Sequence, residues 1–363
     1  MVLKGISWAI LLPAIWSLAS VARADQQGPD VQAIAEHCST AEGLTFICGV
    51  RSAEDIIALD SSPWVIASSY VKAAEGLFLI HRQTGEVRRA PLAGLEKSPP
   101  PNLACRASLP DGLKTHGLAL QTLADGGERL LVVNHGAEET IEVFDVDAGS
   151  SIPQLRWTGC IKLPKPMYGN SVVGLRDGSV IFSEVSTVGN GRSSQSNLLS
   201  GDGAGAVFSW RDGAVVQVRT PTISGPAGLA LSADERWLFI SSWAVGRVWR
   251  IDLSGQVEPQ SVKVDFHPDN LRRDGDTVFA AGQVMELEPF LACQARSDRP
   301  AFCANSWGVA TISTKDMTVV AQKLWKSAVH GDVTVASPVG DELWLGTVGE
   351  TDKIAVVNRA HSK

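Results

Sequence analysis

The sequence has no excess of basic residues. Its 363 residues include 32 Lys and Arg against 39 Asp and Glu, which gives a formal net charge of −7. Nucleic-acid-binding proteins usually carry a basic patch and a high isoelectric point, so this balance argues against a nucleic-acid partner. Apolar residues make up 44% and charged residues 20%. That composition argues against a largely disordered chain and leaves ample material for a large core.

Long apolar runs are absent after the N-terminus. Residues 6–22 are apolar, follow Lys4 and precede the small-x-small sequence Ala22-Arg23-Ala24. This order is typical of a signal peptide, and Pro13 within the run argues against the alternative, an uncleaved anchor. No later run approaches the length of a membrane span. We therefore predict a signal peptide at residues 1–24 and a single exported domain at 25–363. The mature protein would be periplasmic or secreted, with no membrane association.

Cys-x-x-Cys motifs are also absent, which removes the usual signal for zinc or thioredoxin-like chemistry. The six cysteines are even in number, and an exported protein can oxidise them. Six cysteines allow 15 connectivities, so the sequence alone does not fix the pairing. Loop closure favours the near neighbours Cys38–Cys48 and Cys293–Cys303, which leaves Cys105–Cys160.

Helical periodicity of convincing length is missing after about residue 40. Short alternating strands punctuated by Gly-containing turns come instead in six similar packets. The packets start near residues 54, 116, 170, 227, 269 and 332. Repeats of about 40–60 residues with four strands each predict an all-β fold, a six-bladed β-propeller. The alternative is an array of β-sandwiches. Residues 25–50 would join the last blade or cap one face.

The first strand of each packet opens with polar residues in five cases out of six. These residues are Glu54, Asp55, His116, Asn170, Ser171, Asp269, Asn270, His330 and Asp332. First strands line the channel of a propeller, so we expect these side chains to converge at one mouth. Carboxylate and amide oxygens from separate strands suit Ca²⁺. The alternative is that they cap strand starts and bind buried backbone groups. The fourth packet opens with the apolar Ala227.

Several segments resemble the paraoxonase/arylesterase family. They are Ser52-Ala53-Glu54-Asp55-Ile56, Thr115-His116-Gly117-Leu118, Leu131-Val132-Val133-Asn134-His135 followed by Thr140-Ile141-Glu142-Val143-Phe144, Asp269-Asn270 and Leu343-Trp344-Leu345-Gly346-Thr347-Val348. The similarity runs from about residue 48 to 357. The resemblance implies a six-bladed, calcium-dependent lactonase or esterase with a small ester or lactone as its substrate.

The resemblance also implies a role for individual residues. Those that match ligands of the family's catalytic calcium are Glu54, Asn170, Asp269 and Asn270. His116 and His135 match its histidine dyad. Asp55 matches a ligand of a buried structural calcium, and the carbonyl of Leu118 would be another.

Three departures from the family pattern weaken these expectations. Ala227 replaces a calcium-binding Asn, and Ser171 replaces an Asp on the structural calcium. No cysteine follows Cys303, so the family's disulfide between the chain ends is absent. Both sites should bind calcium more weakly, and the structural site, which has lost a carboxylate, is the one expected to be empty.

The implied mechanism is metal-assisted hydrolysis. Calcium would bind the carbonyl oxygen, His116 would take a proton from water, and His135 would orient His116 or relay the proton. No Gly-x-Ser-x-Gly motif signals a serine nucleophile. Two other functions stay open. One is a non-catalytic binding propeller, which Ala227 favours, and the other is a gluconolactonase-like hydrolase of sugar lactones, whose class lacks the histidine pair.

Three inserts interrupt the repeat. Residues 286–307 carry Cys293 and Cys303 and are a candidate for a stapled lid over the pocket. The Gly/Ser-rich segment 189–205 could also shape the pocket, although a plain linker is the favoured interpretation. Residues 95–103 are expected to be a surface loop.

Overall fold

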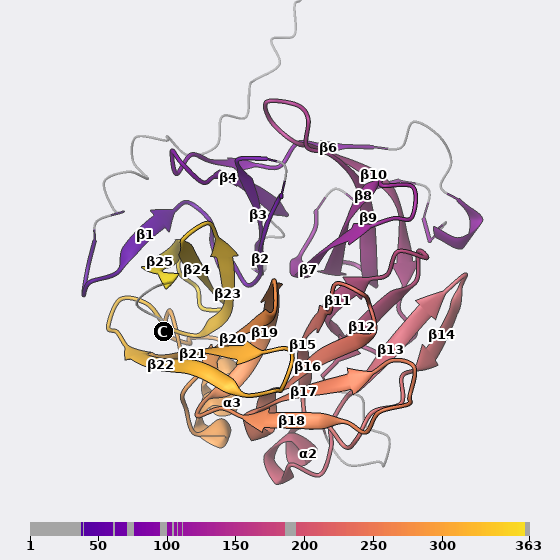
Figure 1. Cartoon of the computed structure of the whole chain (residues 1–363). Helices are drawn as coiled ribbons and strands as arrows, with labels where there is room; N and C mark the ends of the chain where they lie inside the picture. Colours follow the sequence, from indigo (N-terminus) through magenta and orange to yellow (C-terminus); the bar gives the residue numbers. More distant parts are fainter. Residues whose placement is uncertain are drawn as a thin grey trace, which may run out of the picture.

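Six sheets, antiparallel except where β6 (Leu92–Ala93) pairs with β10 (Gln154–Lys162), surround a central axis in the computed structural model (Figure 1), which confirms the predicted six-bladed β-propeller. The structure describes residues 38, 40–60, 62–70, 76–94, 100–103, 105–106, 108–110, 112–185 and 194–359. The predicted signal peptide lies outside them. None of the helices in this described part is long and apolar enough to cross a membrane.

Each blade has its first strand innermost. The strands of the six blades, in chain order, are β2–β5 (Ile56–Ala58, Trp64–Ser68, Leu77–His81, Val87–Arg89); β7–β10 (Thr115–Thr122, Glu128–His135, Glu139–Asp147, Gln154–Lys162) with β6 (Leu92–Ala93); β11–β14 (Gly169–Gly174, Val180–Glu184, Ala206–Arg211, Ala214–Gln217); β15–β18 (Pro226–Leu231, Trp237–Ser242, Arg247–Asp252, Gln260–Lys263); β19–β22 (His267–Asp274, Thr277–Gln283, Ser306–Ser313, Val319–Lys326); and β23–β25 (Val333–Val339, Glu342–Thr347, Lys353–Asn358) with β1 (Thr45–Cys48).

The ring is closed by an early segment of the chain. β1 pairs antiparallel with β25, so a strand from near the N-terminus completes the blade made by the C-terminus. This confirms that part of the 25–50 segment joins the last blade. The inner strands β2, β7, β11, β15, β19 and β23 each contact the next around the axis. The apolar faces of the blades form the core between them, where the indole rings of Trp157 in β10, Trp307 in β21 and Trp344 in β24 are fully buried.

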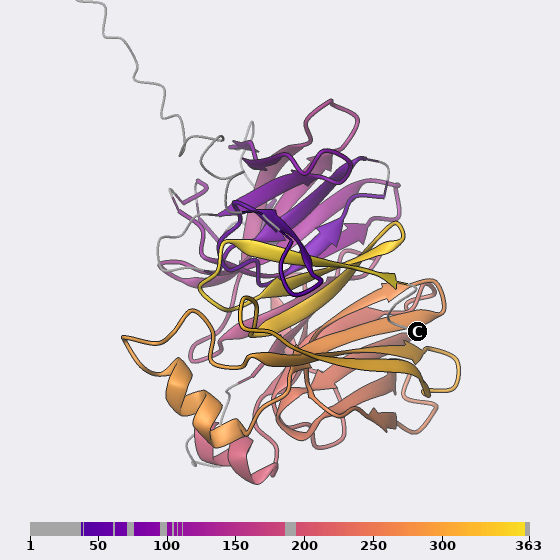
Figure 2. The same cartoon turned by 90° about the vertical axis from the view of Figure 1, so that its left-hand side faces the viewer.

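Three disulfides join the pairs that loop closure favoured, Cys38–Cys48, Cys105–Cys160 and Cys293–Cys303. They indicate folding in an oxidising compartment. Two α-helices, α2 (Ser194–Ser200) and α3 (Leu287–Gln294), lie side by side at one end of the channel (Figure 2). The described connections also include the 3₁₀ turns η1 (Pro101–Leu103) and η2 (Trp243–Val245).

Candidate active site at one mouth of the channel

A β-bulge aims side chains into the channel at the same point of four successive inner strands. The register shifts between Thr115 and Leu118, and it shifts equivalently in β11, β15 and β19. The residues inside these bulges are the pairs His116-Gly117, Asn170-Ser171, Ala227-Gly228 and Asp269-Asn270. A bulge leaves its residues unpaired and turns a side chain away from the sheet. Five of the polar residues that recur in the sequence therefore lie at bulges, namely His116, Asn170, Ser171, Asp269 and Asn270.

Glycine is required at the second position of two bulges because the blades approach closely there. A Cβ on Gly117 would lie 2.3 Å from the carbonyl oxygen of Asn170, and a Cβ on Gly228 would lie 2.4 Å from that of Asp269. Both distances are far below van der Waals contact. These glycines let adjacent bulges touch, which brings the functional residues of neighbouring blades within reach of one another.

The bulges open into a cavity of about 330 Å³. Glu54, His116, Asn170 and Asp269 lie on its floor, together with Ala227. Its walls are largely apolar and aromatic, and both helices contribute to them. The wall residues include Tyr70, Tyr168, Val185, Leu198, Trp243, Phe290, Leu291 and Val348. The segment 286–307 thus forms part of the cavity wall through α3 and is closed by the disulfide Cys293–Cys303, and its role as a lid stays a prediction. From the segment 189–205, Leu198 of α2 reaches the cavity.

Three buried oxygens beside this floor have no hydrogen-bond partner among the described residues. They are Oε2 of Glu54, Oδ1 of Asn170 and Oδ1 of Asn270. Buried polar atoms are almost always satisfied, so unpartnered oxygens from three blade starts fit a bound cation. No cluster of three His, Cys, Asp or Glu side chains suited to a metal occurs in the described part of the chain, so a cation here would depend on the asparagine oxygens.

The two carboxylates of the floor repel one another in the absence of a cation. Burial, and then the charge of Glu54, raise the pKa of Asp269. Asn270 offsets part of the charge by donating from Nδ2 to Oε1 of Glu54 at 2.7 Å. Gln283 also donates to Oδ2 of Asp269, at 3.3 Å, and its own Oε1 accepts from the indole of Trp243. The floor therefore carries an excess of negative charge in a buried place, which a divalent cation would neutralise.

The two predicted histidines are in direct contact. Nδ1 of His116 lies 2.8 Å from Nε2 of His135, and Nδ1 of His135 lies 2.7 Å from Oε2 of Glu139. The remaining nitrogen, Nε2 of His116, faces Oε1 of Glu54 at 3.4 Å and Nδ2 of Asn170 at 3.5 Å. The structure thus joins the histidine pair to the proposed metal ligands through the ring of His116.

The surroundings give His116, His135 and Glu139 different pKa values. Burial and the neighbouring His116 lower the pKa of His135 to about 2. Burial also lowers the pKa of His116, but the carboxylates of Glu54 and Asp269 outweigh it and the net shift is upward. Burial raises the pKa of Glu139 to about 7. Of the two histidines, His116 is therefore the one suited to hold a proton.

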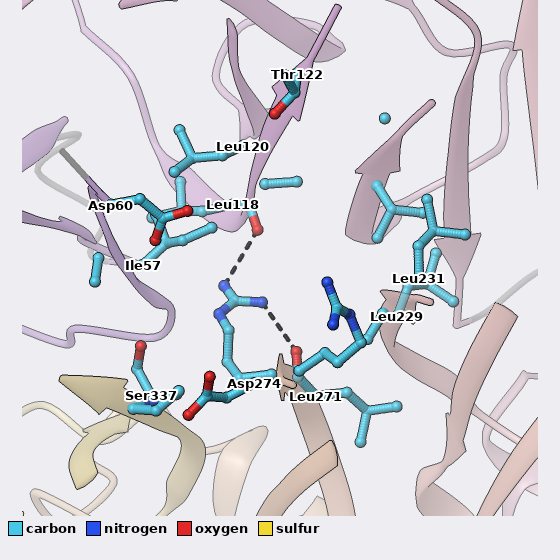
Figure 3. A pocket seen from close by; sticks show the side chains of 18 of the residues that line it. Ile57, Asp60, Leu118, Leu120, Thr122, Leu229, Leu231, Leu271, Asp274 and Ser337 are labelled. Carbon is cyan, nitrogen blue, oxygen red and sulfur yellow. Dashed lines mark hydrogen bonds between the residues drawn. The ribbon is translucent and has the colours of Figure 1, made fainter. Parts of the chain in front are cut away.

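Asp55 does not fit a second calcium ion. Nη2 of Arg272 lies 2.5 Å from its Oδ1, and the backbone N–H groups of Ile56 and Leu118 donate to its two oxygens. The guanidinium also donates to the carbonyls of Ile56, Leu118 and Leu271; Figure 3 shows the last two bonds. A positive group thus already satisfies both predicted ligands, the carboxylate and the Leu118 carbonyl. This arrangement argues against a metal role for Asp55.

Two other expectations about the channel mouth are wrong. His330 and Asp332 do not line the cavity; from their blade, Thr334 and Val348 do. The ring of His330 is buried against Phe46 and Trp307. The carboxylate of Asp332 accepts hydrogen bonds from the backbone of Cys303 and Ala304, which anchors the segment after α3.

Ser171 is the residue that replaces an Asp of the family's structural calcium site. Its hydroxyl accepts a hydrogen bond from the backbone N–H of Leu229 in the next blade.

Sequence reasoning missed Glu139, Tyr70, Tyr168 and Gln283. The ring of Tyr168 stacks on His135 with centroids 4.0 Å apart, and the ring of Tyr70 packs against both histidines. The two tyrosine hydroxyls lie 2.5 Å apart. No sequence spacing indicated the tyrosines, because they lie outside the strands that carry the repeat. Glu139 had a signal, since it follows His135 closely across a hairpin.

Comparison with solved structures supports the fold. A gluconolactonase from Xanthomonas campestris superposes with a TM-score of 0.50 at 13% identity, over 87% of this chain and 89% of that one. A luciferin-regenerating enzyme superposes with a TM-score of 0.51 at 12% identity, over 87% and 96%. No family model matches the chain, and no curated protein matches it. The chain therefore has the six-bladed propeller fold that gluconolactonases share, and its resemblance to paraoxonases stays a prediction.

Proposed function

We propose that the protein is a calcium-dependent hydrolase of esters or lactones, with calcium held by Glu54, Asn170, Asp269 and Asn270. The observation that carries the proposal is the position of Nε2 of His116. It lies close to the side chains of Glu54 and Asn170, which carry two of the three unpartnered oxygens, at the floor of a cavity that can hold a small molecule. A cation site next to a histidine nitrogen supplies both parts of metal-assisted hydrolysis.

The reaction adds water to an acyl carbon. Calcium, when bound, supplies a Lewis acid for the carbonyl oxygen. Nε2 of His116 removes a proton from a water molecule, whose oxygen forms a bond to the carbonyl carbon. The bond to the alcohol oxygen then breaks, and the proton held by His116 passes to that oxygen. The products are a carboxylic acid and an alcohol, or one hydroxy acid from a lactone. His135 orients His116 and does not touch the substrate.

The cavity walls bear on the substrate class. Leu198, Phe290 and Leu291 present apolar surface to the cavity, which suits an ester or lactone with an aliphatic or aromatic part. The named activity of one structural neighbour, a gluconolactonase, supports a lactone as substrate. A sugar lactone is a second candidate on that ground. A binding propeller without catalysis is a third, because Ala227 contributes no oxygen to the floor.

Hydrolysis of phenyl acetate, an aliphatic lactone and gluconolactone by the purified protein distinguishes these three candidate functions. We expect hydrolysis of the first two in calcium and its loss on chelation. His116→Gln should lower the rate about 10²-fold or more while leaving calcium binding intact. His81→Gln, in β4 and away from the cavity, is the matched control.

Two outcomes count against the proposal, and a third would select the second candidate. If calorimetry on the chelated protein shows no calcium uptake at millimolar concentrations, the proposed hydrolase function fails, and a non-catalytic binding propeller becomes the better proposal. The same holds if calcium binds but none of the three compounds is hydrolysed. A preference for gluconolactone would support the sugar-lactone hydrolase.

A further inference from the structure

Glu139 stands at the end of a hydrogen-bonded series that leads to the cavity floor. His135 and Glu139 are directly opposite each other in the hairpin of β8 and β9, and Nδ1 of His135 lies 2.7 Å from Oε2 of Glu139. Nε2 of His135 then lies 2.8 Å from Nδ1 of His116. Stacking of Tyr168 on His135 holds the plane of the ring in this series.

The direction of these hydrogen bonds follows from the chemistry of the groups. Above its pKa of about 7 the Glu139 carboxylate is ionised and only accepts, and a neutral imidazole carries one N–H and one lone pair. Glu139 therefore requires the proton of His135 on Nδ1, which makes Nε2 of His135 an acceptor. That acceptor requires the proton of His116 on Nδ1. Nε2 of His116 is then left with its lone pair facing the cavity floor.

A second carboxylate favours the opposite arrangement. Oε1 of Glu54 lies 3.4 Å from Nε2 of His116 and would accept from a proton placed there. That tautomer reverses both bonds in the series and leaves no base facing a water molecule. An acceptor on Nδ1 of His135 opposes this reversal, and so does the long contact from Nδ2 of Asn170, which can donate only to an unprotonated Nε2 of His116 at 3.5 Å. Among the described residues Glu139 supplies that acceptor, with Lys114 and Glu184 as the other charged groups near it.

We propose that Glu139 is a positioning residue that fixes the tautomers of both histidines, so that His116 presents an unprotonated Nε2 to the cavity. Its importance for hydrolysis rests on the proposed function, but its effect on the tautomers does not. The same arrangement assists the reaction after proton transfer. The imidazolium of His116 then donates from Nδ1 to His135, which passes the polarisation on to the Glu139 carboxylate.

Three variants separate this role from a structural one. Glu139→Gln keeps an oxygen that can accept from His135, whereas Glu139→Met keeps the length of the side chain and removes every acceptor. Glu138→Gln is the matched control, because Glu138 is the adjacent residue, pairs with Lys162 and lies away from the histidines. Each variant is studied as the full mature chain in calcium.

The first readout is nitrogen NMR of protein labelled with ¹⁵N-histidine, with signals assigned by means of His116→Gln. We expect Nδ1–H tautomers for His116 and His135 in the native protein, in Glu138→Gln and in Glu139→Gln. In Glu139→Met we expect His135, and with it His116, to shift to the Nε2–H form. Native tautomers in Glu139→Met would overturn the proposal, even in a protein that hydrolyses nothing.

The second readout is the split between kcat and KM. Glu139→Met should lower kcat about 10²-fold with little change in KM, and Glu139→Gln should recover most of the loss. A structural role would affect both substitutions alike and would alter KM as well, so equal losses in the two variants contradict a positioning role. If the native protein shows the expected tautomers but no hydrolysis, the proposed function fails and the tautomer assignment stands.

Discussion

The guanidinium of Arg272 and the carboxylate of Asp55 form an ion pair at the centre of the propeller. The two groups lie 2.5 Å apart, Asp55 is fully buried, and the side chain of Arg272 is 10% exposed. Arg272 belongs to β19 and Asp55 precedes β2, while the Leu118 carbonyl that also accepts from Arg272 belongs to β7. One side chain thus ties three blades together, at a position where the family resemblance implied a metal ion.

Arg272→Met should destabilise the fold. It leaves the Asp55 carboxylate buried without a positive partner, and it removes the donor to the carbonyls of Ile56 and Leu118. Breaking a buried ion pair from one side costs about 3–5 kcal/mol of unfolding free energy. Urea denaturation in excess calcium measures the loss, with Arg273→Met on the same strand as the control.

Native mass spectrometry should find one calcium ion per chain, and two ions would contradict the assignment of Arg272 as the central cation.

Ala227→Asn should tighten calcium binding. Ala227 lies in the bulge of β15, on the floor of the cavity beside Asn170 and Asp269, so an amide there adds a neutral oxygen to the proposed ligand set. Calcium affinity rises with the number of protein ligands, and we expect a gain of about 10-fold. Titration calorimetry compares Asn with Ala227→Leu, which adds similar volume without an oxygen. Equal affinities for the two variants would rule out this position as part of the site.

Removal of the Cys293–Cys303 disulfide should loosen α3 without unfolding the propeller. The helix contributes Phe290 and Leu291 to the cavity wall, and this disulfide closes the segment that carries it. In Cys293→Ser/Cys303→Ser we expect faster hydrogen exchange in α3 and a raised KM, with kcat less affected. The control is Cys38→Ser/Cys48→Ser, which opens a loop of the same sequence separation away from the cavity. Similar changes in both variants would show that α3 is not a lid.

The repeat in the sequence predicted the blades and most of the cavity floor, because each bulge recurs at the start of an inner strand. His116, Asn170 and Asp269 occupy equivalent places in three blades, so their convergence follows from symmetry alone. The same reasoning fails for His330, which precedes β23 and packs between blades. A strand start indicates where a residue lies along the channel, but not whether its side chain turns into the channel or between the sheets.

Contacts that depend on long side chains could not be read from the repeat. Arg272 and the Ile56 carbonyl that it binds are 216 residues apart, and no pattern in the sequence links them. Ser171 indicated only that a negative charge was missing from the structural site. Glu139 was within reach of prediction, because a hairpin that pairs His135 with Glu139 places the two side chains on one face.

His330 should make stability depend on pH. It is fully buried between Phe46 of β1 and Trp307 of β21, where the closing strand meets the neighbouring blade. Neither ring nitrogen makes a hydrogen bond of normal geometry to a described residue, and the Leu345 backbone nearby offsets only part of the effect of burial on the pKa. Burial, and then the charge of Lys353, lower the pKa of His330 from 6.5 to about 4. The neutral form is therefore favoured in the folded protein.

The sign of the effect follows from proton binding. Between pH 6.5 and about 4 the unfolded chain holds a proton on His330 that the folded protein lacks, so stability falls as the pH falls. The full contribution is present above pH 6.5. By pH 4 the loss amounts to about 3 kcal/mol of unfolding free energy.

Replacement of the ring should remove this part of the acid sensitivity. In His330→Leu the unfolding free energy relative to the native protein should rise by about 2–3 kcal/mol between pH 7.5 and pH 4.5. Urea denaturation across this range measures the difference, and His81→Leu in β4 is the control. The other buried histidines titrate alike in both proteins, so the comparison isolates His330. A constant difference between native and His330→Leu proteins at all pH values would mean that folding does not change the pKa of His330, which contradicts this prediction.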